Sequence, residues 1–258
     1  MEDNNGCSSA TGRLSVVGTG PGSLAYLTPA AREALREADV VIGYRTYLEL
    51  IGELIADKDV LSSAMMQEVD RVRSALLLAE GGKKVALVSG GDPGIYAMAG
   101  LVYEMAAELD SSVEIRVVAG IAALNGCAER LGAPLMHDFA TISLSDLLTP
   151  WEVIEQRLQA AAAADFVIVL YNPKSKKRSR HLDRALEIIG GYREPATPVG
   201  VVTAVTREHE RIVVSSLETF DSALVDMQTT VIVGNSRTFV WRGKMITPRG
   251  YRSKYRLD

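Results

Sequence analysis

The sequence predicts an α/β protein of two α/β domains with mixed, largely parallel sheets. Two observations lead to this prediction. Short apolar runs alternate with longer helical patterns along the chain, and this alternation is typical of parallel sheets covered by helices on both faces. The alternation also restarts after Ala119 to Ala122, which divides the 258 residues into two similar halves. We therefore expect an N-terminal domain over 13–119 and a C-terminal domain over 120–246, flanked by a disordered tail over 1–12 and a second tail over 247–258.

The first half contains the clearest helix boundaries. Thr28 and Pro29 predict a helix start, because threonine caps helix N-termini and proline is tolerated at the first helical position. Gly81 and Gly82 predict a helix end, since glycine adopts the conformation that closes a helix. In this half we expect strands at 14–17, 40–42, 85–88 and 113–118, and helices at 69–80 and 95–109.

The second half repeats the pattern with shorter links between some strands. Those links, around 140–144 and 199–215, predict an antiparallel portion of the sheet, because antiparallel strands need only short connections. In this half we expect strands at 140–144, 166–170, 199–205, 211–215 and 230–233, and helices at 121–131, 151–164 and 180–189.

The composition is that of an ordinary soluble protein, with 47% hydrophobic and 23% charged residues. A net charge of −4 argues against general nucleic-acid binding, which usually needs a basic excess. No apolar run approaches the ~20 residues of a membrane span, and the polar N-terminus does not resemble a signal peptide. Of the two cysteines, Cys7 lies in the polar tail and Cys127 in an apolar helical pattern, so we expect no disulfide and a cytoplasmic location.

A first glycine-rich loop, GTGPGS, covers Gly18 to Ser23 after a predicted strand. The dinucleotide pattern G-x-G-x-x-G requires glycine where Ser23 stands, and Pro21 lacks a backbone N–H. A P-loop would need a Gly-Lys-Ser/Thr ending, which is absent. The loop is therefore not expected to bind phosphate; it is either a tight strand-to-helix turn or part of another kind of site. A nucleotide-dependent oxidoreductase is the alternative from another class, but it fails at Ser23, and Asp39, near the expected ribose-binding offset, cannot rescue it alone.

A second loop, SGGDPGIY, covers Ser89 to Tyr96 and is the stronger functional signal. Gly90 and Gly91 allow a ligand to approach the backbone closely. Asp92 offers an acceptor, and Pro93 stiffens the turn. The loop follows a buried strand and precedes a helix, which is where open α/β sheets bind ligands. A structural turn is the alternative, but a run with this much glycine is an entropically costly way to build one.

Charged and histidine residues provide two further candidates. A basic segment after Tyr171 suits a polyanionic substrate, although a solvated helix start is an alternative. His137 and Asp138, with Ser143, Ser145 and Asp146 nearby, are candidates for general acid or base catalysis or for a structural role. His137, His181 and His209 lack metal-ligand spacing, so no metal site is expected, and no G-x-S-x-G elbow indicates a serine hydrolase. The basic segment consists of Lys174, Lys176, Lys177, Arg178, Arg180, His181 and Arg184.

Taken together, the segments GTGPGS, SGGDPGIY, the run from Val117 to Glu152, VLYNPKSKKR and TTVIVGNS resemble the tetrapyrrole methylases, the class III S-adenosylmethionine-dependent methyltransferases. The resemblance spans Gly12 to Gly250. Within the family, the stretches from Leu131 to Glu152 and from Tyr171 to Arg178 are most similar to members that methylate carbon 17 of a corrinoid precursor. These are enzymes of cobalamin biosynthesis that act on precorrin-3B or cobalt-factor III, with contraction of the ring.

The resemblance implies two α/β domains, a cofactor cleft between them, a homodimer and S-adenosyl-L-methionine as cofactor. It also implies a set of cofactor-binding residues by motif position. Ala119 replaces the proline that relatives have before the linker glycine, and Ala122 and Ala123 stand where many relatives have a hydroxyl. The implied cofactor set is Pro21, Gly90, Gly91, Asp92, Ile95, Ala122, Ala123, Tyr171, Asn172, Thr203, Ala204, Thr229 and Thr230.

The implied reaction explains why the sequence contains no strong nucleophile constellation. In methyl transfer to carbon the substrate itself is the nucleophile, so the protein chiefly orients the two reactants. His137, Asp138, Ser143 and Asp146 are the candidates for proton transfer, and Lys174, Lys176, Lys177 and Arg178 for binding substrate carboxylates. Alternatives are a methylase of the same pathway acting at another carbon, the methylase of diphthamide synthesis, and a binding domain without catalysis.

Overall fold

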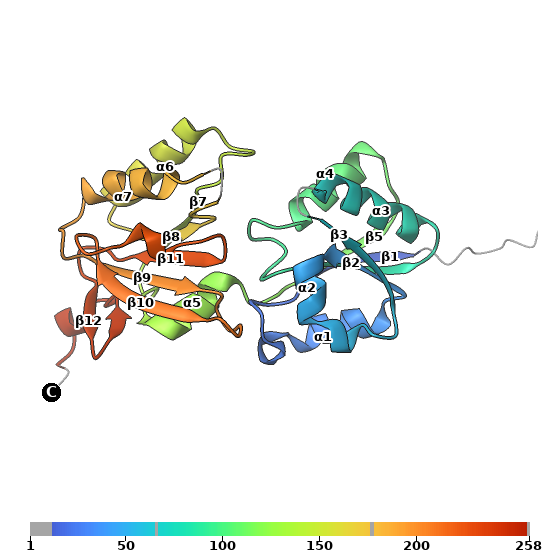
Figure 1. The fold of residues 1–258 in the computed structure, drawn as a ribbon, viewed down its shortest axis with the longest axis horizontal. Coiled ribbons are helices and arrows are strands. Elements are labelled where there is room, and N and C mark those ends of the chain that lie inside the picture. Colours follow the sequence, from blue (N-terminus) through green and yellow to red (C-terminus); the bar gives the residue numbers. More distant parts are fainter. Residues whose placement is uncertain (1–11, 65–66, 176–177, 257–258) are drawn as a thin grey trace, which may run out of the picture. The chain divides into compact units, whose positions relative to one another are not determined.

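The computed structural model describes residues 12–64, 67–175 and 178–256, and the chain forms two compact units (Figure 1). Unit 1 comprises Met1–Ala122 and unit 2 comprises Ala123–Asp258. The expected disordered tail lies outside the described residues except for Gly12, as do Cys7, Lys176 and Lys177. Within the described part of the chain, no helix combines the length and the apolar character needed to cross a membrane.

Unit 1 contains a sheet of five parallel strands in the order β3-β2-β4-β1-β5. The four strands predicted from apolar runs are confirmed. The fifth, β3, was missed because it is an edge strand whose Val60 and Leu61 are exposed, so its sequence shows no buried pattern. The strands are β1 (Arg13–Gly18), β2 (Val40–Tyr44), β3 (Asp59–Ser63), β4 (Lys84–Ser89) and β5 (Glu114–Val118).

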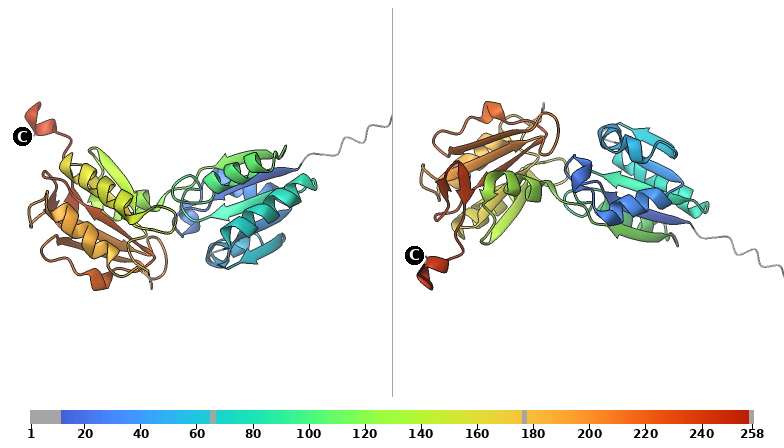
Figure 2. Two further views of the ribbon diagram at one scale, coloured as in Figure 1. Left: turned by 90° about the horizontal axis from the view of Figure 1, so that it is seen from above. Right: turned by 90° about the horizontal axis from the view of Figure 1, so that it is seen from below.

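Helices cover both faces of this sheet (Figure 2). The helix start predicted at Thr28 is confirmed, since its Oγ1 accepts a hydrogen bond from the backbone N–H of Ala31. Helix α4 begins at Ala99 rather than at Ile95, because the intervening residues form turns that include a left-handed Tyr96. The helices are η1 (Leu24–Tyr26), α1 (Pro29–Glu37), α2 (Arg45–Leu50), η2 (Gly52–Leu54), α3 (Glu68–Glu80) and α4 (Ala99–Glu108).

The adjacent strands β1 and β4 form the topological switch point of unit 1. Helix α1, which follows β1, packs on the face that contains Val17. Helix α4, which follows β4, packs on the opposite face together with α3, against Leu14 and Val16. The chain therefore leaves these two neighbouring strands toward opposite faces, and the loops that follow them border the position where open α/β sheets bind ligands.

Unit 2 contains a mixed sheet in the order β10-β9-β11-β8-β7. The antiparallel portion that the sequence indicated comprises β9, β10 and β11, and β11 is also antiparallel to β8. Strand β7, which we expected in that portion, runs parallel to β8, because α6 connects the two strands as a crossover. The strands are β7 (Phe139–Ser143), β8 (Val167–Tyr171), β9 (Pro198–Thr203), β10 (Arg211–Ser216) and β11 (Thr229–Val233).

Helices α6 and α7 pack together on one face of this sheet, and α5 packs on the other (Figure 1). Helix α5 begins at Ala123, two residues later than expected. A small sheet, β12-β13-β6, was not predicted because its strands are too short to show a pattern. The remaining elements are α5 (Ala123–Leu131), α6 (Trp151–Ala163), α7 (His181–Gly190), η3 (Ser222–Leu224), η4 (Tyr251–Ser253), β6 (Gly132–Ala133), β12 (Phe239–Trp241) and β13 (Lys244–Ile246).

A buried arginine joins the ends of several elements in unit 2. The side chain of Arg193 is 2% exposed. Its guanidinium donates to the backbone carbonyl oxygens of Ala162 at 2.7 Å, Phe166 at 2.9 Å and Gly234 at 3.3 Å. These carbonyls belong to the end of α6, the turn before β8 and the segment after β11. One side chain thus satisfies backbone acceptors that are far apart in the sequence.

We expect Arg193→Met to lower the free energy of unfolding by about 3 kcal/mol, because it leaves several buried carbonyl oxygens without donors. Chemical denaturation followed by circular dichroism measures this loss. The matched control is Arg184→Met, since the Arg184 side chain is 51% exposed and its ion pairs with Glu155 and Glu187 lie at the surface. The assignment is contradicted if the two variants unfold at the same denaturant concentration.

Candidate functional site

The two glycine-rich loops of unit 1 are held together by their backbones. The N–H of Gly91 donates to the carbonyl oxygen of Gly20 at 2.8 Å, and the N–H of Gly20 donates to that of Gly91 at 3.2 Å. Gly20 and Gly91 both adopt positive φ, at 75° and 67°, which side chains other than glycine rarely tolerate. The first loop, which lacks a phosphate-binding motif, therefore has a structural role that the sequence did not reveal. Its backbone holds the loop SGGDPGIY in place.

Asp92 connects this turn to a third loop, the one that follows β5. One carboxylate oxygen accepts from the N–H of Gly94 at 2.8 Å, and the other accepts from the N–H of Gly120 at 3.1 Å. Gly120 approaches so closely that an added Cβ would stand 2.1 Å from the carbonyl oxygen of Gly91. The sequence suggested Asp92 as an acceptor for a ligand, whereas both of its oxygens fix the loop backbone. Three loops thus form one rigid edge after β1, β4 and β5.

The other candidates of unit 1 lie on or beside this edge. Pro21 is buried, and Ile95 is half-buried with its N–H donating to the carbonyl oxygen of Asp92. Gly90 faces the ring of Tyr47, because an added Cβ would stand 2.5 Å from its Cε1. Ala122 is buried at the end of the unit. Tyr47 belongs to α2, which sequence patterns did not predict, so this neighbour of the loop was missed.

In unit 2 the remaining cofactor candidates share one edge of the sheet. Ser143 pairs with Tyr171 at the carboxyl ends of the parallel strands β7 and β8. Thr203 at the end of β9 pairs with Thr229 at the start of β11. The register of β11 on β8 places Thr230 at the level of Tyr171. Short polar side chains therefore converge where these strands end, although they come from four segments of the chain.

Hydrogen bonds and backbone conformation order this edge. Asn172 donates from Nδ2 to Oγ of Ser143 at 3.0 Å, and the hydroxyls of Thr203 and Thr229 are 2.8 Å apart. The hydroxyl of Tyr171 accepts from the N–H of Leu124 at 2.9 Å, which ties β8 to the start of α5 beside Ala123. Asn172 and Ala204 both have φ of 50°. Such strained residues persist where surrounding structure holds them, and they concentrate at functional sites.

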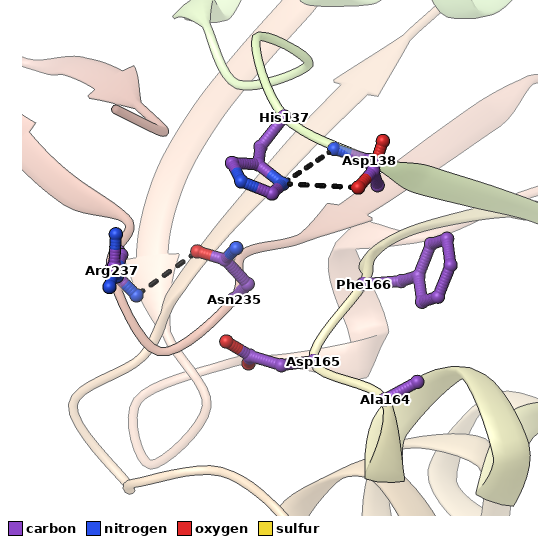
Figure 3. Close-up of a pocket in the computed structure, with 7 residues that line it drawn as sticks. All are labelled: His137, Asp138, Ala164, Asp165, Phe166, Asn235 and Arg237. Atoms are coloured by element: carbon purple, nitrogen blue, oxygen red, sulfur yellow. Dashed lines mark hydrogen bonds and ion pairs between the residues drawn. The ribbon is translucent and has the colours of Figure 1, made fainter. Parts of the chain in front are cut away.

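The four candidates for proton transfer are divided into two pairs. Ser143 ends β7, and Asp146 follows shortly after it. His137 and Asp138 precede β7, so about five residues of strand, ~17 Å, separate them from Ser143. They line a small cavity of about 280 Å³ at the opposite edge of the sheet with Asp165, Asn235 and Arg237 (Figure 3). The structure therefore does not bring the set of four together.

The cavity at the opposite edge is bordered by a structural turn. Asp165, with φ of 59°, accepts hydrogen bonds from the N–H and the hydroxyl of Ser236. Partial burial raises the pKa of Asp165, but the hydrogen bonds from Ser236 and the charge of Arg193 outweigh this and hold it below the ordinary value. His137 Nδ1 accepts from the N–H of Asp138 at 2.8 Å. The polar groups here mainly satisfy one another.

The basic segment does not form one uniform patch. Arg184 pairs with Glu155 and Glu187, and Lys174 donates to the carbonyl oxygen of Ser222 at 3.0 Å. Arg178, in contrast, is only 8% exposed. Within the described residues its Nη1 has no hydrogen-bond partner and no carboxylate lies within ion-pair distance. A buried cation without a counter-ion is unfavourable, so this guanidinium is suited to an anionic partner.

The sequence did not predict one cluster of side chains at the carboxyl edge of the sheet in unit 2. His181 Nε2 lies 3.0 Å from Oδ2 of Asp146, and the ring of Trp151 meets the imidazole edge-on at a centroid distance of 4.4 Å. The sequence named His181 only within the basic segment and Asp146 only beside His137. The two are 35 residues apart, and no local pattern could have paired them.

Neither thiol nor metal chemistry gains support from the described residues. Cys127 is fully buried, as expected, and burial raises the pKa of its thiol to about 12, with a smaller opposing contribution from Thr230. A thiol with such a pKa stays protonated and is not a nucleophile at neutral pH. Across the parts of the chain that the structure describes, no three residues of the types His, Cys, Asp and Glu are grouped closely enough to hold a metal ion.

Residues 13–221 match the family model of the tetrapyrrole (corrin/porphyrin) methylases. The match covers most of the chain, and the chain belongs to this family. Among curated relatives, it is 50% identical to the probable cobalt-factor III C(17)-methyltransferase of Salmonella typhimurium over 92% of its own length and 99% of the relative. It is 45% identical to the precorrin-3B C(17)-methyltransferase of a Sinorhizobium species, covering 88% and 91% of the two chains.

Some relatives are longer. The chain is 51% identical to the cobalt-factor III methyltransferase of Priestia megaterium, but it spans only 46% of that protein, about half its length. Among solved structures, the methyltransferase CobJ superposes with a TM-score of 0.85 at 37% identity, covering 92% of this chain and all of that one. A uroporphyrin-III C-methyltransferase from Thermus thermophilus, solved with S-adenosyl homocysteine, has a TM-score of 0.66 at 24% identity and shows the shared fold.

Tetrapyrrole methylases use S-adenosylmethionine. The edge of unit 1 fits such a cofactor in two respects. It lies at the switch point of a parallel sheet, and Gly91 adds no side chain to the main chain there, so that part of a nucleoside can approach the backbone. In unit 2, the hydroxyl and amide groups at the carboxyl edge of the sheet are hydrogen-bond donors and acceptors of the kind that a polar ligand requires.

We expect Gly120→Ala to weaken S-adenosylhomocysteine binding by about tenfold or more, because the new methyl group forces the loop of Gly91 to move. Isothermal titration calorimetry measures the dissociation constant. Gly100→Ala is the matched control, since nothing lies within 4 Å of its added Cβ in α4. An unchanged affinity of the Gly120→Ala variant, with a native circular dichroism spectrum, would count against the loop as a cofactor site.

Proposed function

We propose that the chain transfers a methyl group from S-adenosylmethionine to carbon 17 of a corrinoid precursor, as a cobalt-factor III or precorrin-3B C(17)-methyltransferase of cobalamin biosynthesis. The observation that carries this proposal is the 50% identity to a probable enzyme of this kind over 99% of its length. The family membership supports the tetrapyrrole substrate class. The sequence stretches from Leu131 to Glu152 and from Tyr171 to Arg178, which suggested carbon 17, belong to that alignment range.

The proposed cofactor contacts are the residues that the family resemblance implies, and they form one set in each unit. In unit 1 they are the backbone of the loop at Gly90, Gly91 and Asp92, with Pro21 and Ile95 beside it. In unit 2 they are the polar groups at the strand ends. The support for the second set is that its members gather at one edge of the sheet although they are distant in sequence. That set is Ala123, Tyr171, Asn172, Thr203, Ala204, Thr229 and Thr230, and Ala122 at the end of unit 1 completes the proposal.

The chemistry requires positioning more than activation by the protein. S-adenosylmethionine supplies a methyl group on a positively charged sulfur, and an electron-rich carbon of the tetrapyrrole displaces it. Holding two reactants in line can contribute up to ~7–11 kcal/mol to lowering the barrier. The rigid loops of unit 1, fixed through Asp92 and Gly120, suit this role because they do not have to reorganise during the reaction.

For the substrate we propose binding through its carboxylates by Lys174, Lys176, Lys177 and Arg178. Arg178 has the strongest support, because its buried guanidinium lacks a counter-ion among the described residues. Nη1 is the donor that a carboxylate would engage, because Nε already donates to Oγ of Ser175 at 3.3 Å and Nη2 to Sδ of Met227 at 3.8 Å. Lys176 and Lys177 lie outside the described residues and enter this proposal from the sequence alone.

Ring contraction coupled to methylation is part of the proposal, and it requires proton transfer near the reacting carbon. Ser143 and Asp146 keep the role of candidates, because they lie at the same edge as the proposed cofactor contacts. His137 and Asp138 lie at the other edge and have no comparable support. The homodimer and the cytoplasmic location that the sequence suggested stay predictions.

The first test is the reaction itself. Purified protein is incubated with S-adenosylmethionine and either precorrin-3B or cobalt-factor III, and the product is analysed by mass spectrometry and NMR. We expect a gain of one methyl group at carbon 17 with at least one of the two substrates. Methylation at another carbon would support a different member of the same pathway. Absence of turnover despite cofactor binding would support a binding function and contradict the proposal.

A second test concerns Arg178. We expect Arg178→Gln to raise KM for the tetrapyrrole about tenfold, because one charge-assisted contact is worth about 1.5–3 kcal/mol. The dissociation constant for S-adenosylhomocysteine should not change. Arg157→Gln is the matched control, since Arg157 is an exposed residue of α6. If KM stays constant in the Arg178→Gln variant, the residue does not bind substrate and its role is structural.

A further inference from the structure

The residue pair Asp146 and His181 lies where the first turns of two helices meet the carboxyl edge of the sheet in unit 2. His181 is the first residue of α7, and Trp151 is the first residue of α6. Asp146 follows Leu144, whose N–H donates to the carbonyl oxygen of Tyr171 and so prolongs the pairing of β7 with β8. The pair therefore stands just beyond the strand ends that hold Ser143 and Asn172.

The geometry fixes one nitrogen of the imidazole and leaves the other available. Nε2 of His181 lies 3.0 Å from Oδ2 of Asp146, with side-chain exposures of 21% and 35%. The edge-on ring of Trp151 restricts the rotation of the imidazole. Among the described residues Nδ1 has no hydrogen-bond partner. In the tautomer in which Nε2 donates to Asp146, Nδ1 carries a lone pair that can accept a proton.

The proposed reaction needs such an acceptor. The new carbon–carbon bond takes its electron pair from the substrate, and the broken carbon–sulfur bond returns its pair to sulfur. The positive charge of the sulfonium thereby passes to the methylated tetrapyrrole, which becomes neutral again only when one of its own protons leaves. The thioether sulfur that leaves is too weak a base to take up this proton, so we assign its acceptance to a group of the protein or a water molecule.

We propose that His181 is the catalytic base that accepts this proton at Nδ1, and that Asp146 is a positioning residue that orients the imidazole and stabilises the imidazolium. The assignment rests on the proposed function. A carboxylate that holds a histidine in one tautomer and supports its charged form is an arrangement found in general base catalysis. The base then releases the proton to solvent, so that each turnover returns His181 to its neutral form. His181 thus replaces His137 as the histidine assigned to proton transfer.

The charged residues near Asp146 and His181 lie on α7 and on the loop before α6. On α7, Asp183 and Arg184 are the nearest charged residues that follow His181, and Arg184 is neutralised by Glu155 and Glu187. Arg180 precedes it and is exposed. On the loop before α6, Asp146 is the charged residue that faces the imidazole. The Asp146 carboxylate is therefore the charged group that holds the imidazole in place.

The test compares variants in single-turnover and steady-state kinetics with the tetrapyrrole substrate. We expect His181→Ala to lower kcat by about a hundredfold or more, the usual contribution of a general base, while the S-adenosylhomocysteine dissociation constant and KM stay near wild type. Added imidazole should restore part of the rate, which a purely structural role would not allow. Asp146→Asn should lower kcat by about tenfold, and Asp146→Glu should recover part of that loss.

His209→Gln is the matched control, because His209 is an exposed histidine in the loop between β9 and β10 and has no assigned role. Wild-type enzyme assayed in parallel separates the two proposals. If wild type forms no methylated product, the proposed function fails. If wild type is active and His181→Ala keeps its rate, or loses it without rescue by imidazole while its unfolding free energy falls, the assignment of His181 as a base is overturned.

Discussion

The contact on which the site in unit 1 depends is the backbone pairing between Gly20 and Gly91, completed by the carboxylate of Asp92 on Gly120. Gly20 and Gly91 have positive φ, and Gly120 lies so close that an added Cβ would stand 2.1 Å from the carbonyl oxygen of Gly91, so each position favours glycine. The loops after β1, β4 and β5 therefore hold one another in place. A loop that is held in this way would not have to be ordered first for the proposed cofactor to bind, and such ordering lowers affinity.

In unit 2, other contacts hold the carboxyl edge of the sheet in place. Its edge is organised by side-chain hydrogen bonds, from Asn172 to Ser143 and between Thr203 and Thr229, rather than by paired glycines. The left-handed conformations of Asn172 and Ala204 are stabilised by this network and by the adjoining strands. Hydroxyls and amides ordered in this way keep lone pairs and protons in defined directions, and such preorganisation is what a site for in-line transfer requires.

The buried arginines and the histidines of unit 2 differ in their hydrogen-bonding partners. Arg193 is buried and fully used by backbone carbonyls, whereas Arg178 is buried with Nη1 unpartnered among the described residues. Likewise, the polar groups at His137 satisfy one another at the amino-terminal end of β7, while Nδ1 of His181, at the carboxyl edge, has no hydrogen-bond partner among the described residues. Residues of the same type can therefore be proposed for different roles, because the tertiary structure gives them different hydrogen-bonding partners.

The sequence by itself determined the α/β class, most strands and helices, and the two glycine-rich loops, because burial periodicity and turn chemistry are local properties. It missed β3, whose apolar residues are exposed, and the short strands of the small sheet. It also grouped His137 with Ser143, because the two residues are close in the sequence. Sequence proximity does not reveal that β7 separates them and places them at opposite ends of the strand. Only the tertiary structure paired Asp146 with His181 and showed that the carboxylate of Asp92 holds the loop of Gly120 in place. Contacts across 28 to 35 residues depend on strand order and register, which the sequence does not reveal.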